Sequence, residues 1–426
     1  MLRILRRRPT WTSPPTGCAA YDRGVRTPTP RLLRAAALAA LAALLAGGVS
    51  GCSVGPAPHG ASTTAARSAT PSSTPTPTAS PTTDPLAAMT LQQKVGQLFM
   101  VGTQATEVDQ TTASDISTLH AGSLFLAGRS YAGTTATAAI VAKFQALATQ
   151  DATAGLPLFV ATDQEGGEVQ VLNGPGFDDM PSALQQGGMS AEALMGAAAR
   201  WGSQLRASGV DMNLAPVADL VPSAQAAENN PPIGGFDRQF GYDPATITSH
   251  AFAFRVGMDT AGVVPVVKHF PGLGFVSENT DTDTGVTDTV TTSTSPSVGV
   301  FASQIDTGAQ VVMMSSAIYS RIDAHSPAVF SSAVVTGLLR DKLGFQGVIM
   351  SDDLSAAAQT MPWSPADRAV LAIEAGVDIV LASADPSVAV PMIDAVVAKA
   401  QADPAFAATV DAAARRVVTL KKQLLG

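Results

Sequence analysis

The sequence predicts an α/β protein whose fold is a (β/α)8 barrel of the TIM type, beginning at residue 86 of 426. Eight short apolar runs alternate with longer Ala-rich segments of helical pattern, and polar residues follow many of these runs directly. Repeated βα units favour a parallel sheet, and eight units favour its closed form. A doubly wound open sheet is the alternative, but no G-x-G-x-x-G opens the first helix.

The predicted strands are residues 97–102, 122–127, 157–162, 210–215, 263–268, 310–315, 347–351 and 377–381. The predicted helices include residues 136–149, 191–208, 244–261, 333–343 and 365–375. Each strand is short and predominantly apolar, as expected for strands buried on both faces. No Ser/Thr/Pro-rich linker interrupts the chain after residue 85, so residues 86–426 are predicted to form a single domain.

Composition narrows the classes of function. The chain is 46% hydrophobic and 14% charged, with a formal net charge of -8. No Lys/Arg-rich block occurs beyond the first 34 residues, so nucleic acid is not an expected partner. Both cysteines, Cys18 and Cys52, precede the globular part, and the five histidines form no H-x-x-x-H pair. We therefore expect no metal site. No motif implies a cofactor, and a monomer is the expected state.

The first 51 residues are interpreted as a targeting signal and not as part of the folded domain. Arg31 and Arg34 precede a small-apolar run over residues 35–46, which is typical of a secretory signal. The run is too short for a transmembrane helix of about 20 residues. It ends in Val-Ser-Gly-Cys at 49–52, which resembles a bacterial lipobox and implies lipidation of Cys52. An ordinary signal followed by a coincidental cysteine is the alternative.

Residues 52–85 are predicted to be a disordered tether. The stretch consists almost wholly of Ser, Thr, Pro, Ala and Gly, which cannot bury enough apolar surface to order the chain. A lipid anchor followed by a tether predicts a domain at the outer face of the cell membrane. Secretion without an anchor is the other extracytoplasmic expectation.

Polar side chains cluster where the predicted strands end, which is where (β/α)8 barrels carry their chemistry. These strand ends read Thr162-Asp163-Gln164-Glu165, Asp219, Lys268-His269, Ser315-Ser316 and Ser351-Asp352-Asp353. Carboxylates and cations that converge on one rim suit a polyhydroxylated ligand, because each hydroxyl both donates and accepts hydrogen bonds. A carbohydrate is therefore the expected partner.

Four motifs in order resemble family-3 glycoside hydrolases. They are Asp-Gln-Glu-Gly-Gly at 163–167, Asn-Leu-Ala-Pro-Val-Ala-Asp at 213–219, Lys-His-Phe-Pro-Gly at 268–272 and Gly-Phe-Gln-Gly-Val-Ile-Met-Ser-Asp-Asp-Leu at 344–354. The resemblance is closest to the single-domain bacterial β-N-acetylglucosaminidases of cell-wall turnover and covers residues 88–424. It implies a retaining, exo-acting β-N-acetylhexosaminidase that cleaves terminal N-acetylglucosamine from cell-wall-derived glycans or muropeptides.

The resemblance implies Asp352 as the nucleophile that forms a covalent glycosyl-enzyme. Asp353 is its neighbour on the same strand, and because neighbours alternate faces, we expect Asp353 to cap a helix beginning near Leu354. The resemblance also implies substrate binding by four residues, which are Asp163, Arg238, Lys268 and His269. Asp219 follows Pro216-Val217 and is expected to support them, although it could equally cap a turn.

The sequence departs from the family where an acid/base is expected. The Lys-His-Phe-Pro-Gly motif normally continues into Asp-Ser-His, but the same offset lands on Asn279-Thr280-Asp281, without a histidine. Asp281 is the first candidate for the missing proton donor, with Glu278 or Asp283 as alternatives. The other functions left open are a catalytically impaired sugar-binding surface lipoprotein, a β-glucosidase or β-xylosidase, and a glycoside phosphorylase.

Overall fold

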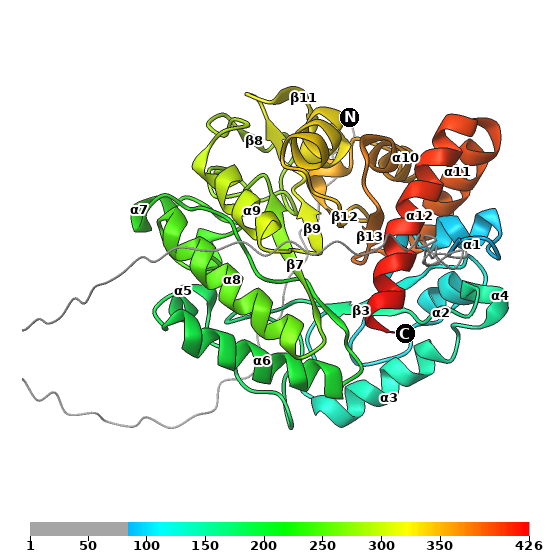
Figure 1. Ribbon diagram of the computed structural model, residues 1–426, viewed down its shortest axis with the longest axis horizontal. Coiled ribbons are helices and arrows are strands. Elements are labelled where there is room, and N and C mark those ends of the chain that lie inside the picture. The colour runs from blue at the N-terminus through cyan, green and yellow to red at the C-terminus, as the bar shows by residue number, and fades with distance from the viewer. Residues whose placement is uncertain (1–83, 426) are drawn as a thin grey trace, which may run out of the picture. The chain divides into compact units, whose positions relative to one another are not determined.

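The computed structural model describes residues 84–425, in which eight parallel strands close into a barrel (Figure 1). Around the barrel the strand order is β1-β13-β12-β9-β7-β6-β3-β2, which confirms the predicted fold class. The strands are β1 (Phe99–Gln104), β2 (Ser123–Ala127), β3 (Phe159–Thr162), β6 (Met212–Asn213), β7 (Val264–Phe270), β9 (Val311–Met314), β12 (Val348–Asp353) and β13 (Ile379–Ala382). Each overlaps one predicted strand. The predicted signal, Cys52 and nearly all of the tether lie outside the described residues.

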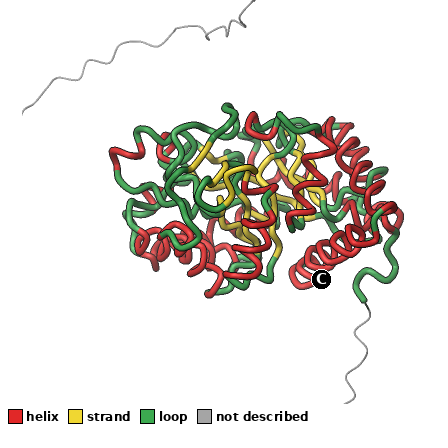
Figure 2. Tube along the Cα trace, turned by 90° about the horizontal axis from the view of Figure 1, so that it is seen from above, coloured by secondary structure: helices red, strands yellow, loops and turns green. Residues whose placement is uncertain are grey.

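Helices surround the strands, as the trace in Figure 2 shows. The α-helices are α1 (Leu91–Gly96), α2 (Gln110–Ser117), α3 (Gly133–Gln145), α4 (Gln150–Thr153), α5 (Ala183–Gln186), α6 (Ala191–Ala207), α7 (Ala224–Ala227), α8 (Pro244–Thr260), α9 (Pro296–Asp306), α10 (Pro365–Ala375), α11 (Ala389–Ala402) and α12 (Pro404–Leu424). Shorter turns are η1 (Gly234–Phe236), η2 (Ala328–Phe330), η4 (Ala358–Thr360) and η5 (Pro386–Val388), and η3 (Ala333–Lys342) has π-type hydrogen bonding. Within residues 84–425, no helix has the length and apolar character needed to cross a membrane.

Local sequence explains where the long helices begin. Ser190 accepts a hydrogen bond from the backbone N–H of Ala193 at the start of α6. Asp243 does the same for Thr246 at the start of α8, where Pro244 occupies the first turn. These side chains satisfy N–H groups that have no partner within the helix, and proline is tolerated there because its missing N–H is not needed.

Alternating strand residues divide the core into two layers. The barrel interior is filled by one set of apolar side chains, including Val264 and Val266 of β7. Neighbours such as Val263 and Val267 instead pack in the layer that contains the helices. Because successive strand residues point to opposite faces, one apolar run supplies both layers.

Helix α12 closes the end of the barrel where the strands begin. Its Val417 and Leu420 belong to the interior cluster. The buried Lys421 ammonium donates to Gln97 Oε1 at 2.8 Å and to the Gly122 carbonyl at 2.5 Å. Burial lowers the pKa of Lys421 to about 7. Helix α12 does not cover the opposite end of the barrel, where the strands end and where the candidate active site lies.

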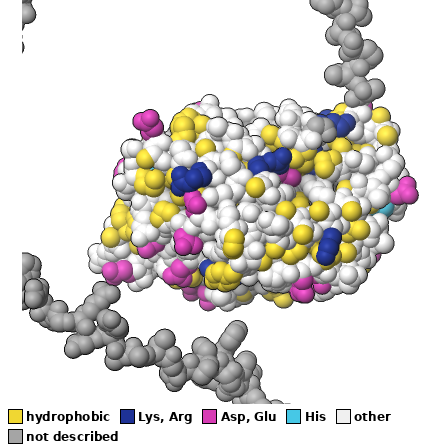
Figure 3. Space-filling model, turned by 90° about the horizontal axis from the view of Figure 1, so that it is seen from below, with side chains coloured by type: hydrophobic (Ala, Val, Ile, Leu, Met, Phe, Trp, Pro, Cys, Tyr) yellow, Lys and Arg dark blue, Asp and Glu magenta, His cyan; other side chains and the backbone are white. Residues whose placement is uncertain are grey.

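Two small sheets that the sequence did not predict lie on the loops after β3, β7 and β9. Strands β4 (Gln164–Gly166) and β5 (Val169–Gln170) form a hairpin directly after β3. A second sheet is built from β8 (Thr287–Asp288), β10 (Ile318–Tyr319) and β11 (Asp323–Pro327). Figure 3 shows one face of the molecule, on which acidic and basic side chains are scattered among apolar ones.

Candidate active site

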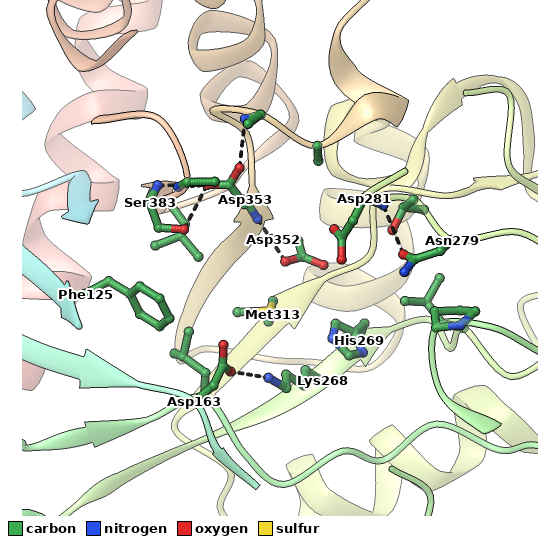
Figure 4. A pocket seen from close by; sticks show the side chains of 18 of the residues that line it. Phe125, Asp163, Lys268, His269, Asn279, Asp281, Met313, Asp352, Asp353 and Ser383 are labelled. Atoms are coloured by element: carbon green, nitrogen blue, oxygen red, sulfur yellow. Dashed lines mark hydrogen bonds and ion pairs between the residues drawn. The ribbon is translucent and has the colours of Figure 1, made fainter. Parts of the chain in front are cut away.

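A pocket of about 440 Å³ lies at the carboxyl ends of the barrel strands. It is lined by residues from β2, β7, β9, β12 and β13 and from the loops that follow β3, β6, β7, β12 and β13 (Figure 4). The lining includes Asp163, Arg238, Lys268, His269, Asp281 and Asp352. The structure therefore brings together every residue predicted for substrate binding, the predicted nucleophile and the first candidate for the acid.

One side of the pocket is a network of buried ion pairs, here called the ion-paired side: Asp163, Glu165, Arg238 and Lys268. The Lys268 ammonium lies 2.6 Å from Asp163 Oδ1 and 2.7 Å from Glu165 Oε1. Arg238 donates to both oxygens of Glu165, from Nε at 2.9 Å and from Nη2 at 2.8 Å. This fork fixes the plane of the guanidinium group as well as its position.

The ion-paired side is charged at neutral pH. Burial opposes ionisation of Glu165, but Arg238 and Lys268 outweigh it and lower the pKa of Glu165 to about 2. Burial also opposes the charge on Lys268, but Asp163 and Glu165 raise its pKa above the ordinary value. Sequence reasoning assigned Glu165 no role, although it lies two residues after Asp163 in the same motif.

His269 is oriented by Asp219, as expected for a supporting residue. Asp219 is fully buried, and its Oδ2 lies 2.7 Å from His269 Nδ1. Its Oδ1 accepts the backbone N–H of Leu273 at 2.8 Å. These contacts use Nδ1 of the imidazole, while Nε2 lies 3.5 Å from Arg238 Nη2. His269 and Lys268 both line the pocket although they are consecutive, and in this stretch the pairing of β7 with β9 shifts register, between Val267 and Phe270.

Asp352 and Asp353 end β12 and point in different directions. Figure 4 shows the Asp352 carboxyl group directed into the pocket, toward Asp281. Asp353 Oδ1 accepts from the backbone N–H of Ser383 at 2.8 Å, and its Oδ2 accepts from that of Ala356 at 2.8 Å. The prediction that Asp353 caps a helix near Leu354 is wrong, because the chain turns there and η4 begins only at Ala358. Asp353 instead ties the loop after β12 to the loop after β13.

Asp281 and Asp352 form the other side of the pocket, here called the carboxylate side. The Asp281 backbone N–H donates to Asn279 Oδ1 at 3.0 Å, and its carbonyl accepts from Ala358 N–H at 3.1 Å. Asp281 is exposed to solvent as a residue, but the protein around its carboxyl group removes much of the hydration of that group. This burial and the nearby Asp352 carboxylate raise the pKa of Asp281 to about 6. Asp353 adds to the shift, while Arg238 and His269 oppose it.

The two alternative acids, Glu278 and Asp283, lie outside the pocket lining and are exposed. Asp283 Oδ2 instead accepts from the Thr282 hydroxyl at 2.8 Å and from the Asn279 backbone N–H at 3.3 Å. Of the three carboxylates considered from sequence, Asp281 alone lines the pocket. In the described part of the chain, no group of three or more His, Cys, Asp or Glu side chains is arranged to hold a metal ion.

A (β/α)8 barrel that carries two facing carboxyl groups and a polar, ion-paired wall at its carboxyl end is the arrangement of a glycoside hydrolase. The sequence profile of the glycosyl hydrolase family 3 N-terminal domain matches residues 90–420. The chain belongs to this family.

Individual relatives agree with this assignment. The crystal structure of β-N-acetylhexosaminidase from Beutenbergia cavernae is 59% identical, with a TM-score of 0.78, over 78% of this chain and 99% of that one. The β-hexosaminidase of Xanthomonas campestris is 32% identical over 67% of this chain and 83% of its own length. An uncharacterized secreted glycosyl hydrolase of Arthroderma benhamiae is 38% identical over 58% of this chain and 69% of its own length.

Proposed function

We propose that this protein is a retaining, exo-acting β-N-acetylhexosaminidase with Asp352 as nucleophile and Asp281 as acid/base. The observation that carries the proposal is the pair of carboxyl groups that face one another in one pocket (Figure 4). Asp281 has a pKa of about 6, which suits a group that must hold a proton near neutral pH and then release it. The 59% identity to a β-N-acetylhexosaminidase supports the choice of sugar.

The ion-paired side is proposed to bind the terminal sugar. Asp163 accepts hydrogen bonds from ring hydroxyls, whereas Lys268 and Arg238 donate to them. His269 offers Nε2 as an acceptor, because its Nδ1 donates to Asp219. Phe125 and Met313 also line the pocket and offer apolar surface to the carbon face of the ring. A volume of about 440 Å³ is near the lower end for ligand pockets and supports binding of one terminal sugar rather than a long run of sugars.

The reaction is proposed to proceed by two displacements. An Asp352 oxygen attacks the anomeric carbon while Asp281 gives its proton to the glycosidic oxygen, and the aglycone leaves as an alcohol. The Asp281 carboxylate then takes a proton from water, whose oxygen attacks the anomeric carbon and releases Asp352. Retention is proposed because the chain belongs to glycoside hydrolase family 3, and the resemblance implies a covalent glycosyl-enzyme on Asp352.

The nucleophile is tested by trapping. A 5-fluoro-N-acetylglucosaminyl donor should form a stable glycosyl-enzyme, and peptide mapping should find the label on Asp352. Label on any other residue would contradict the assignment. Hydrolysis of the aryl N-acetylglucosaminide in clear preference to the matching glucoside and xyloside supports the hexosaminidase. The reverse preference supports the glucosidase alternative, and absence of turnover of all three supports a binding protein.

The natural substrate and location are proposed to be muropeptides at the outer face of the cell membrane, where lipidated Cys52 would anchor the chain. The similarity to a secreted glycosyl hydrolase supports an extracytoplasmic site. Radiolabelled palmitate should label the full-length protein in cells, and Cys52→Ser should abolish both the label and membrane association. Unchanged membrane association of Cys52→Ser would contradict the anchor.

A further inference from the structure

The loop that carries Asp281 is fastened to the segment that follows Asp352. Two backbone hydrogen bonds join them: Ala358 N–H to the Asp281 carbonyl at 3.1 Å, and Gln359 N–H to the Thr280 carbonyl at 3.0 Å. The side chain of Gln359 then reaches back to Val286, farther along the same loop. The loop over residues 279–286 is thus held at both of its ends by residues 358–359, here called the clamp.

Gln359 contributes more to the clamp than its backbone. Its Oε1 accepts the Val286 backbone N–H at 2.9 Å, and its Nε2 donates to the Val286 carbonyl at 3.2 Å. Gln359 is 2% exposed and Val286 is fully buried, so water cannot readily replace either bond. A primary amide carries the donor and the acceptor that this pairing needs. Losing it leaves the buried Val286 N–H without a partner, while the Val286 carbonyl keeps the backbone N–H of Ile318 at 2.9 Å.

The clamp connects the two reacting groups. Asp352 is the last residue but one of β12, and residues 358–359 begin η4, the next element along the chain. Asp281 lies between the two ends of the loop that the clamp holds, and its own carbonyl is one of the acceptors. Any displacement of the loop away from residues 358–359 therefore moves Asp281 relative to Asp352.

We propose that Gln359 is a positioning residue that holds the carboxyl group of Asp281 in place against Asp352. The inference rests on the proposed function, because it takes Asp281 as the acid/base. Gln359 does not line the pocket and acts only through the loop. Its effect is therefore expected on proton transfer and not on binding of the terminal sugar.

The test is Gln359→Met, which keeps the length of the side chain and removes both hydrogen bonds. On an aryl N-acetylglucosaminide with a poor leaving group, kcat should fall by at least about tenfold more than on an activated one, because only the first needs protonation. The alkaline limb of the pH profile should move to lower pH, because Asp281 leaves the influence of the surrounding protein and of Asp352. Backbone amides of residues 279–286 should exchange with solvent faster.

Gln145→Met is the matched control. Gln145 makes the same pair of bonds with Leu158, accepting its N–H at 3.0 Å and donating to its carbonyl at 2.9 Å, before β3 begins at the other end of the barrel. The Gln145→Met variant should have lower thermal stability than the parent enzyme, with the same leaving-group dependence and the same pH profile. Gln359→Glu, which when protonated offers both a donor and an acceptor, should lose less activity than Gln359→Met.

The outcomes separate this proposal from the proposed function. Suppose that the loss of kcat in Asp281→Asn depends strongly on the leaving group while Gln359→Met behaves like Gln145→Met. The positioning role of Gln359 is then overturned, and the assignment of Asp281 as the acid is retained. Equal losses on both substrates with an unmoved pH profile in Gln359→Met also overturn it. If Asp281→Asn itself shows no leaving-group dependence, the acid assignment fails and the positioning role fails with it.

Discussion

The ion-paired side and the carboxylate side of the pocket hold their charges in opposite ways. On the first, every carboxylate has a buried cation within 3 Å, such as Lys268 at 2.6 Å from Asp163. On the second, Asp281 and Asp352 face one another, and Asp281 is held through its backbone rather than through a cation.

This difference separates fixed charge from exchangeable charge. Cations keep Glu165 ionised at neutral pH, so the ion-paired side presents the same donors and acceptors throughout a reaction cycle. Asp281 has a pKa raised toward neutrality by burial and by Asp352, so it can change its protonation state within the cycle. A glycosidase needs both kinds of carboxylate, and here they occupy opposite sides of a single pocket.

The largest loss of activity is expected when the nucleophile is removed from the carboxylate side. Asp352→Ala should lower kcat on the order of 10⁴-fold or more, because no covalent intermediate can form. The ion-paired side should remain intact, so the affinity for the product N-acetylglucosamine, measured by calorimetry, should change little. Comparable loss of product binding would show that the two sides are not separable.

Removing the acid should cost less and depend on the substrate. Asp281→Asn should lower kcat/KM by about 10²–10⁴-fold for substrates with poor leaving groups and far less for activated ones. Steady-state kinetics over a series of aryl glycosides measures this difference. Glu278→Gln, on the same loop but outside the pocket, is the control and should match the parent enzyme. A loss of the same size in Glu278→Gln would reject Asp281 as the acid.

Breaking the ion-paired side should affect stability as well as activity. Lys268→Met leaves Asp163 without its buried cation, and removal of one partner of a buried ion pair typically costs about 3–5 kcal/mol of unfolding free energy. Denaturant titration should show this loss together with a raised KM. Lys143→Met, on the exposed face of α3, should leave both unchanged. A stable Lys268→Met enzyme with unaltered KM would contradict the importance of the network.

The two sides should also respond to pH in separate windows. Above pH about 6, kcat/KM should fall by about tenfold per unit as Asp281 loses the proton it must donate. Glu165 has a folded-state pKa of about 2, below its ordinary 4.5, so its stabilising contribution is complete above 4.5 and is lost as pH falls toward 2. The difference in unfolding free energy between the parent and Glu165→Gln isolates that contribution. A change near pH 6 in the unfolding free-energy difference between the parent and Glu165→Gln would contradict the expectation that the two sides titrate in separate pH windows.

Much of this site was predictable because strand ends in a closed barrel meet at one rim. Asp163, Lys268 and Asp352 each follow an apolar run, and the barrel alone brings them together. Glu165 and Gln359 were not predictable, because their partners are far away in sequence: Arg238 and Val286 are each 73 residues from them. Asp281 was already the first candidate from the sequence, but that it lines the pocket and Asp283 does not depends on the fold. Roles inferred from the family resemblance, including that of Asp352, stay predictions.

The closure of the barrel has a consequence for how the chain is made. Strand β1 pairs with β13, so the ladder between residues 99–101 and residues 380–382 cannot form until the last strand has been synthesised. A ribosome, or an export channel that threads the chain from its N-terminus, delivers β1 long before its partner. During that interval one edge of the growing sheet is unpaired, and unpaired edges recruit other strands. The time between emergence of the first and last strands is therefore when this edge is open to pairing with another chain.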